Sequence, residues 1–326
     1  MLLIESSVFV DSLLIFILAF LIDVVFGEFP DRVHPTVWIG KAIAFFKPKF
    51  KSENPRTEKV NGILLCVLVI LLVAVPVGVL LFAIRHFIGR IPYIVVAAVL
   101  LETTFAVKCM RQYTVPIAEA LKNRDIDKAR KGLYYIVRRD PTKLNEQQIV
   151  SAAVESIAES TTDGITTPFF FFALLGVPGA FAFRVINTLD STVGYKDPEN
   201  INIGWFSANL DTAANYVPAR LTALLMVAAS ALSGENWRES WRILQRDKAK
   251  TNSVNAGWTM SAMAGALGVQ LEKSGHYALG DKGDISPADI TRALRVMELT
   301  AVLFGAVVVL PVLALKALAI RLALQC

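Results

Sequence analysis

The chain has 326 residues, of which 54% are hydrophobic and only 19% are charged, and its formal net charge at pH 7 is +5. This apolar share exceeds that of an average soluble domain and predicts a membrane protein with several spanning helices. The positive charge lies in the connecting segments, so it indicates orientation in a membrane and not nucleic-acid binding. The three cysteines have neither zinc-ligand spacing nor a disulfide framework.

Three apolar stretches in the N-terminal third could span a bilayer. Residues 63–84 carry no charge and are long enough to cross a hydrocarbon core about 30 Å thick. Residues 8–26 and 91–107 contain acidic side chains, and a buried helix of a soluble protein is the alternative for both. No basic segment precedes the first stretch, which predicts an uncleaved first helix with its N-terminus outside. His34 follows this helix, and a lone histidine there is more often structural than catalytic.

The region after the third stretch changes to charged, helical sequence. Residues 115–140 combine apolar and charged positions at helical spacing, and Asp140-Pro141 predicts a stop. Glu155, Glu159 and Asp163 then follow at i, i+4 and i+8, which places three carboxylates on one side of a continuous helix. Such a trio suits Mg²⁺ beside phosphate oxygens. The alternative is a solvated helix face, but the apolar wall that follows favours a functional site.

The apolar run 168–183 is interrupted at its centre by Gly176-Val-Pro178-Gly179. This interruption favours a helical hairpin over a straight span. The next apolar run, residues 213–233, is also short. We therefore expect re-entrant or peripheral helices in both places, which keeps the polar residues 187–212 on the cytoplasmic side. The alternative is two full crossings, with that polar segment outside.

Polar and aromatic side chains are dense between these two runs. They are Asn187, Asp190, Tyr195, Trp205, Asp211, Asn215 and Arg220. Each is weak evidence alone, but together they predict a polar cavity, in which an arginine can grip phosphate or carboxylate with two hydrogen bonds.

The C-terminal third predicts three more helices. Residues 236–250 form a basic amphipathic helix that could lie on the membrane surface or pack against the protein. Residues 252–271 are rich in small side chains that permit close helix packing, although Asn255 and Trp258 at its start could reach a ligand. Residues 299–315 form a second clear span.

The distribution of lysine and arginine predicts the orientation. Residues 32–60, 108–143 and 238–295 are basic, which places all three segments in the cytoplasm. No run of alternating strands occurs, so we expect an all-α, polytopic membrane protein with cytoplasmic helical segments. One membrane-embedded domain over residues 1–326 is the simplest organisation, with the active-site core expected in 108–220. Standard phosphate-binding loops, HExxH, CxxC and GxSxG motifs are absent.

Six ordered motifs cover nearly the whole chain. They are D-x3-GE-x-P-x3-HP (23–35), RD-x-T-x-L (139–144), E-x3-E-x3-DG-x3-P (155–168), NT-x-DS-x-VGY (187–195), GW-x-SA-x-LD-x3-NY-x-PAR (204–220) and NAGW-x-M-x-AMAGALGV-x-L (255–271). With these motifs in this order, the chain resembles the adenosylcobinamide-phosphate synthase family of cobalamin biosynthesis. Two positions depart from the family pattern: Val254 stands where the family has proline, and Thr212 follows Asp211 where the family often has a second aspartate.

The resemblance implies a membrane-bound enzyme that uses ATP as co-substrate and Mg²⁺ as cofactor. It would join adenosylcobyric acid to (R)-1-aminopropan-2-ol phosphate, or to the free amino alcohol, through an amide bond. The implied catalytic residues are Glu155, Glu159, Asp163, Asp190 and His34, of which Glu155, Glu159 and Asp163 would also bind the metal. The implied substrate-binding residues are Arg139, Asn187, Tyr195, Trp205, Asp211, Asn215, Arg220, Asn255 and Trp258.

The expected partners are the corrinoid, the amino-alcohol phosphate and membrane lipid, with no nucleic acid. A homo-oligomer, or a complex with other late enzymes of the pathway, stays open. The expected location is the cell membrane, with the active site facing the cytoplasm. A transporter or a signalling protein of the same fold is the alternative. Retention of the E-x3-E-x3-D, NT-x-D and PAR groups together favours the enzyme.

Overall fold

The computed structural model describes residues 2–323 except 28, 31, 33 and 138, with side chains from Val8 onward. Contacts between residues divide the chain into two compact units. Unit 1 comprises Met1–Ala106, Thr167–Ala214 and Ala306–Cys326, and unit 2 comprises Val107–Thr166 and Asn215–Gly305. Whether the chain acts as one functional domain, with a core in 108–220, stays a prediction.

The all-α membrane class is confirmed. Five helical segments in the described part of the chain are long and apolar enough to cross a membrane, or up to six if one bent pair counts as a single span. The five segments are Val8–Phe26, Pro55–Ile88, Arg90–Lys122, Glu146–Val193 and Pro287–Ala323. The protein is therefore a multi-pass membrane protein.

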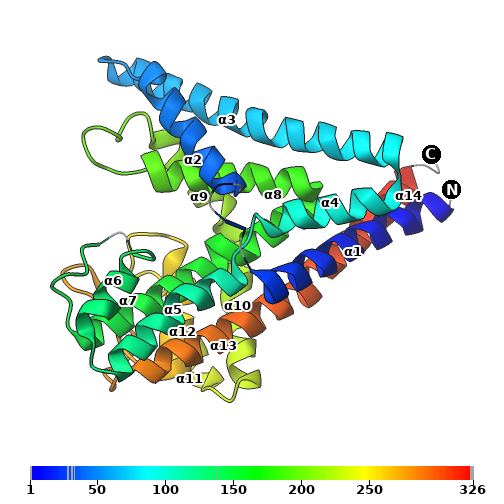
Figure 1. Ribbon diagram of the computed structural model, residues 1–326. Helices are drawn as coiled ribbons and strands as arrows, with labels where there is room; N and C mark the ends of the chain where they lie inside the picture. The colour runs from blue at the N-terminus through cyan, green and yellow to red at the C-terminus, as the bar shows by residue number, and fades with distance from the viewer. Residues whose placement is uncertain (1, 28, 31, 33, 138, 324–326) are drawn as a thin grey trace. The chain divides into compact units, whose positions relative to one another are not determined.

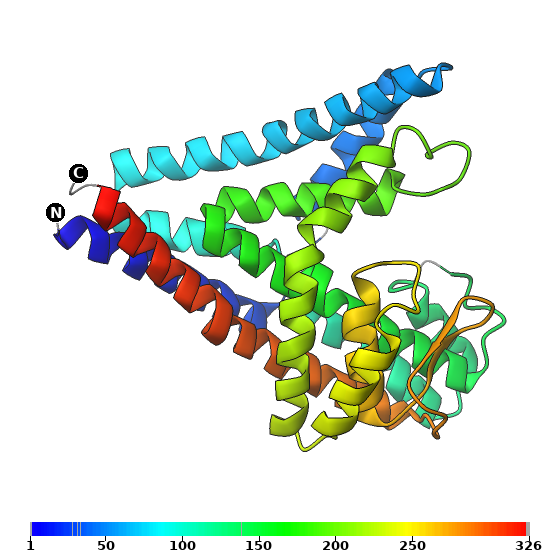
Figure 2. The ribbon, with the colours of Figure 1, turned by 180° about the vertical axis from the view of Figure 1, so that it is seen from behind.

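Unit 1 contains most of the long apolar helices. Its elements are α1 (Leu2–Phe26), α2 (Pro35–Phe46), η1 (Lys47–Phe50), α3 (Pro55–Ala83), η2 (Ile84–Ile88), α4 (Arg90–Glu102), α8 (Thr167–Val193), α9 (Trp205–Ala214) and α14 (Leu310–Ala323). The beginning of α1, the turn from α3 to α4 and the end of α14 lie at the same end of this unit (Figures 1 and 2). Exposed apolar side chains such as Leu71, Val75 and Phe82 on α3 suit contact with lipid.

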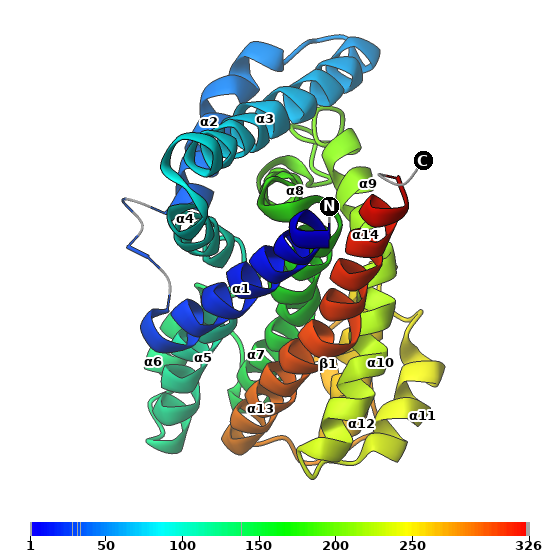
Figure 3. The ribbon, with the colours of Figure 1, turned by 90° about the vertical axis from the view of Figure 1, so that its right-hand side faces the viewer.

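The core of unit 1 joins α2, α3 and α8, which lie beside one another in Figure 3. Leu65, Val69, Val185 and Leu189 are buried within it. The segment before α9 packs closely on α3, because a Cβ atom at Gly62 would lie only 2.2 Å from the carbonyl oxygen of Ile203. Glycine at this position therefore sets the separation of the two segments.

The interruption at Gly176 makes α8 a helical hairpin, as the sequence predicts. Gly176 has φ 73° and ψ −166°, which are not helical angles. The rings of Phe171 and Phe183 stack with centroids 5.4 Å apart. Twelve residues of straight helix would place them about 18 Å apart, so the chain reverses between them. Phe16 and Phe105 pack edge-on against Phe169, on the first arm, at 4.9 and 4.8 Å.

Two predicted helix ends differ from the structure. The expected span 91–107 breaks after Glu102, and a new helix begins at Val107. The hydroxyls of Thr103 and Thr104 donate to the carbonyls of Leu100 and Leu101, a local pattern that competes with helical hydrogen bonding. The expected helical stretch 115–140 is divided between two helices, Val107–Lys122 and Ile126–Leu133, and its helical part ends at Leu133.

Unit 2 is a helical cluster with one small sheet. Its elements are α5 (Val107–Lys122), α6 (Ile126–Leu133), α7 (Glu146–Ser160), η3 (Thr161–Thr166), α10 (Tyr216–Leu232), α11 (Trp237–Asp247), α12 (Ala256–Leu267), β1 (Leu271–Lys273), β2 (Tyr277–Leu279) and α13 (Pro287–Phe304). α7 begins with a capping box between Asn145 and Gln148 and packs against α12, α13 and β1.

The sheet of unit 2 is an antiparallel hairpin that the sequence did not predict. Leu271 pairs with Leu279, and Lys273 pairs with Tyr277. The small-residue segment forms α12, and its Gly265 lets the backbone of α11 approach closely, since a Cβ atom there would lie 2.4 Å from the carbonyl oxygen of Glu239. The expected packing role of this segment is confirmed.

Candidate functional site

The carboxylate of Glu155 lies at the centre of a polar cluster in unit 2. It projects from α7 and is buried, with 7% of the residue exposed. Its Oε1 accepts a hydrogen bond of 2.7 Å from the hydroxyl of Ser151, one helical turn earlier. Arg139 forms a loose ion pair with it, since Nη2 lies 3.4 Å from both carboxylate oxygens. The carboxylate is therefore held by its neighbours.

The β1–β2 hairpin completes this cluster. The Ser151 hydroxyl accepts a hydrogen bond of 2.8 Å from the backbone N–H of Glu272, and the phenol of Tyr277 donates one of 2.9 Å to Glu155 Oε2. Burial of the phenol, and then the negative charge of Glu155, raise the pKa of Tyr277. The phenol consequently stays protonated at neutral pH and keeps its donor role.

A cleft of about 190 Å³ opens beside Tyr277. Glu159, one helical turn after Glu155, supplies an acidic group to its lining, and Lys273 and His276 supply basic groups from the hairpin. The side chains of Thr251, Asn252 and Ser253 line the remaining polar wall. A cleft with an acid on α7 and bases on the hairpin suits a small ligand that carries both signs of charge.

Arg220 is held near the start of α12 by several contacts. Its Nη1 donates to the carbonyl oxygen of Tyr216 at 2.7 Å and to Asn255 Oδ1 at 2.8 Å. Its guanidinium carbon lies 3.4 Å from the centre of the Tyr216 ring and 4.8 Å from that of Trp258. The structure thus brings the predicted residues Arg220, Asn255 and Trp258 together, and Lys248 lies 4.7 Å from the same Trp258 ring. Such cation–π contacts stabilise the arrangement.

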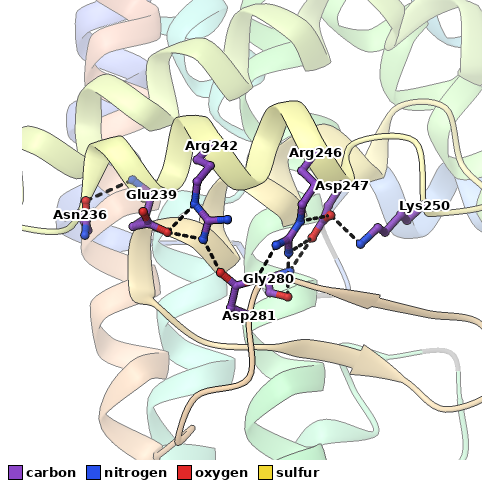
Figure 4. Close-up of polar contacts among 8 residues, drawn as sticks. All are labelled: Asn236, Glu239, Arg242, Arg246, Asp247, Lys250, Gly280 and Asp281. Atoms are coloured by element: carbon purple, nitrogen blue, oxygen red, sulfur yellow. Dashed lines mark hydrogen bonds and ion pairs between the residues drawn. The ribbon is translucent and has the colours of Figure 1, made fainter.

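An ion-pair network fixes the segment that follows β2 to α11 (Figure 4). The fully buried carboxylate of Asp247 accepts a hydrogen bond of 2.8 Å from the backbone N–H of Gly280. Arg246 and Lys250 donate to the same carboxylate at 2.7 and 2.6 Å. Burial opposes ionisation, but these donors outweigh it and lower the pKa of Asp247 to about 2. Asp247 therefore anchors the strand that carries Tyr277.

A second group of predicted residues lies in unit 1, where α8 ends and α9 begins. Asn187 Nδ2 lies 3.3 Å from Asp211 Oδ1, and the guanidinium of Arg184 donates to Asn187 and to the carbonyl oxygen of Thr104. The motifs 187–195 and 204–220 meet because the backbone of Gly204 lies close to the carbonyl oxygen of Val193. A Cβ atom added at Gly204 would lie 1.7 Å from that oxygen.

The exposed rings of this second group are Tyr195 and Trp205, at 41% and 47% exposure. Asp190 lies against Gly194, whose Cβ atom, if present, would meet the Asp190 carboxylate at 2.2 Å. The glycine of the VGY motif is thus required by close packing. The substrate roles expected for these residues stay predictions.

Three further predicted residues have other positions. His34 caps α2, since its Nδ1 accepts a hydrogen bond of 3.2 Å from the backbone N–H of Thr36. Asn215 is buried at the start of α10. Asp163 lies in the π-helical segment η3, so the α-helical register expected from Glu155 to Asp163 changes after Ser160.

The described residues include no group of three or more His, Cys, Asp or Glu side chains placed to hold a metal ion by themselves. Mg²⁺ commonly uses only one or two carboxylates and takes its other ligands from phosphates and water. Glu159, in the cleft, and Asp163, in η3, have the required chemistry, whereas Glu155 is engaged with Ser151, Tyr277 and Arg139. The metal role of the three acidic residues stays a prediction.

Sequence reasoning did not find several residues of this cluster. They are Ser151, Lys273, His276, Tyr277 and Asp247. Ser151 precedes Glu155 by four residues and was detectable as a helical neighbour. The hairpin residues had no such signal, because strands of three residues are too short for alternation to show.

In comparisons with known proteins, the family model and the similar curated proteins point to the same family. The family model described as CobD/Cbib protein matches residues 16–297. The chain is 42% identical over 303 residues to the "Probable cobalamin biosynthesis protein CobD" of Methanothermobacter thermautotrophicus, which covers 91% of this chain and 98% of that protein. It is 43% identical over 277 residues to the "Cobalamin biosynthesis protein CobD" of Dehalococcoides mccartyi, covering 85% and 89%. No solved structure matches the chain.

Proposed function

The chain belongs to the CobD/Cbib protein family, and from this premise we propose that it is an adenosylcobinamide-phosphate synthase of cobalamin biosynthesis. Its reaction would join the free carboxylate of adenosylcobyric acid to the amine of (R)-1-aminopropan-2-ol phosphate, or of the free amino alcohol, with ATP as co-substrate. The names of its relatives support the pathway. The observation that supports the chemistry is the cleft that joins Glu159 to Lys273 and His276.

A carboxylate is a poor electrophile, and mixing it with an amine yields only a salt. ATP removes this obstacle. A carboxylate oxygen attacks the γ-phosphorus, the bond to ADP breaks, and an acyl phosphate forms. The deprotonated amine then attacks the acyl carbon, the C–O bond to phosphate breaks, and nitrogen loses a second proton. ADP, phosphate and the amide are the products.

The charged residues that line the cleft fit the requirements of these two reaction steps. The phosphates of ATP and of the amino alcohol carry negative charge that preorganised cations stabilise, and Lys273, which lines the cleft, would supply one such cation. His276, also in the cleft, would accept a proton from the ammonium group, because imidazole is the side chain most often used as a general base. A base and a cation on one short hairpin would act on opposite ends of the amino alcohol.

Glu159 and Asp163 are the residues that would hold Mg²⁺ together with phosphate oxygens. When bound, the ion would neutralise phosphate charge. Glu155 would have a different role, since its partners fix it in place. By accepting the Tyr277 hydrogen bond it would position the hairpin, and with it Lys273 and His276, over Glu159.

The corrinoid is large and flat, and aromatic rings suit such a surface. Trp258 and Tyr216, which Arg220 holds in place, are the candidates in unit 2. The guanidinium of Arg220 already donates to Asn255 and Tyr216, so we assign it a positioning role as well as the predicted one in substrate binding.

The experiment is incubation of the purified protein with adenosylcobyric acid, the amino-alcohol phosphate and MgATP, followed by mass spectrometry. The proposal predicts an amide product that appears only when all three are present, with ADP formed in equal amount. The free amino alcohol serves as a parallel substrate. Protein that binds the corrinoid or moves it across liposomes, yet forms no amide with either amine, would contradict the proposal and favour the transporter.

A further inference from the structure

A cavity of about 370 Å³ lies in unit 1, and none of its lining residues belongs to the candidate functional site. Its polar end is formed by Asp11 and Ser12 of α1, Arg85 of η2 and Tyr93 of α4. The remaining lining is apolar and includes Leu81, Phe82 and the tip of the α8 hairpin at Gly176 to Pro178. The cavity thus combines one charged end with apolar walls inside a membrane-spanning unit.

Among the residues whose side chains the structure describes, the charges at the polar end are not balanced. The buried carboxylate of Asp11 contacts two guanidinium groups, with Arg90 Nε at 2.6 Å and Arg85 Nη2 at 3.2 Å. Two cations share one anion within this described set. The other terminal nitrogen of Arg85, Nη1, is buried and has no hydrogen-bond partner within the described part of the chain. A buried cationic nitrogen without a partner is costly, which points to an anionic group from outside the protein.

The ring of Tyr93, whose centre lies 5.5 Å from the Arg85 guanidinium carbon, limits where this arginine can turn. Pro178 at the hairpin tip lies close to α3, since a Cβ atom at Gly78 would be 3.6 Å from it. The guanidinium is therefore kept beside the apolar walls. A free phosphate ion would match the charge but would leave these walls without a partner.

We propose that this cavity binds an anionic phospholipid, with the lipid phosphate at Arg85 and part of an acyl chain along Leu81, Phe82 and the hairpin tip. Basic pockets between membrane helices recognise anionic head groups in this way, and charged residues in spans face such cavities. The lipid would fill the space between α1, α3 and the α8 hairpin. The site is independent of the proposed amide synthesis.

The test measures lipid retained by the full-length protein after detergent purification, using native mass spectrometry with an equimolar mixture of phosphatidylglycerol and phosphatidylcholine. Wild-type protein should retain phosphatidylglycerol in preference by about tenfold, the factor that one charge-assisted hydrogen bond can supply. Arg85→Met should lose most of this preference. Because Arg90 still pairs with Asp11, the carboxylate keeps a partner in the variant. Arg56→Met, at the opposite end of α3, is the matched control and should behave as wild type.

Two further arms keep the proposal open to refutation. Phosphatidylglycerol should raise the thermal midpoint of the wild type, whereas inorganic phosphate at the same concentration should not. Phosphatidylglycerol with a photoreactive acyl chain should label residues 78–88 or 172–178 of unmodified protein, which needs no variant. Equal retention of the two lipids, an unchanged preference in Arg85→Met, the same shift with inorganic phosphate, or labelling only elsewhere would each overturn the proposal.

Discussion

The phenol of Tyr277 donates a hydrogen bond of 2.9 Å to the carboxylate of Glu155, although 122 residues separate them in the chain. This bond joins the β1–β2 hairpin to α7 and so holds Tyr277, which lines the cleft, in place. The hairpin is also attached through the Glu272–Ser151 bond and through the Asp247–Gly280 bond, three residues after Tyr277. The positions of Lys273 and His276 depend on these attachments.

We predict that Tyr277→Phe lowers kcat/KM for amide formation by about tenfold or more, since a hydrogen bond to a charged group contributes about 1.5–3 kcal/mol. The ring stays in place, so the fold should persist. Product formation under steady-state conditions gives the measurement. Tyr134→Phe removes an exposed hydroxyl and serves as control. Equal kcat/KM in wild type and Tyr277→Phe would remove the hairpin from the active site.

The anchor at Asp247 predicts a pH-dependent stability. The pKa of this carboxyl is lowered from 3.8 to about 2. Its contribution to stability is therefore complete above 3.8 and is lost as the pH falls towards 2. Asp247→Asn should unfold about 2–3 kcal/mol more easily at neutral pH, and the difference from wild type should shrink below pH 3.8. Denaturant unfolding at neutral pH and below pH 3.8 measures this difference in the free energy of unfolding, with the exposed Asp127→Asn as control. A difference that does not change with pH would contradict the prediction.

Gly62 gives a packing test in unit 1. Gly62→Ala should destabilise the protein by about 1–3 kcal/mol, because the added methyl group would meet the backbone carbonyl of Ile203 at 2.2 Å. Gly40→Ala is the matched control, since no atom lies within 4 Å of its added Cβ. It should be neutral or stabilising by up to about 1 kcal/mol. The midpoints of thermal unfolding in detergent distinguish Gly62→Ala from Gly40→Ala. Equal midpoints for the two variants would show that the approach at Gly62 is not tight.

The hairpin shape of α8 predicts that this helix does not cross the membrane completely and that the polar segments before and after it share one side of the membrane. Single cysteines at Glu53, Lys131 and Lys282, in a background without native cysteine, should resist an impermeant thiol reagent added to intact cells. Phe87→Cys, in the turn from α3 to α4, should react readily. Labelling at Lys282 alone would mean an odd number of crossings between residues 131 and 282.

Much of the fold could be predicted from local sequence. Long apolar runs give the membrane helices, and Gly176 with Pro178 gives the hairpin, because these residues act on the backbone where they stand. The helix over Trp237–Asp247 follows from its apolar and basic spacing. The break after Glu102 was not predicted, because threonine, the residue type at positions 103 and 104, is also found inside helices.

The candidate site could be predicted only in part. Glu155 and Glu159 share one helix, so their spacing was sufficient. Tyr277 and Asp247 act through contacts between segments distant in sequence, and no local pattern indicates such contacts. Arg220 was expected to grip a ligand, but its donors contact Asn255 and Tyr216, and only the fold reveals these partners.

The most direct test of the proposed function concerns Glu159 and its dependence on Mg²⁺. Amide product is measured against Mg²⁺ concentration for wild type, Glu159→Gln and Glu146→Gln, the last being an exposed residue in the first turn of the same helix. The proposal predicts no product from Glu159→Gln, or a curve shifted to higher Mg²⁺, because the amide lacks the charge that a hard cation prefers. Glu146→Gln should match wild type. Full activity of Glu159→Gln at ordinary Mg²⁺ would contradict the proposed site.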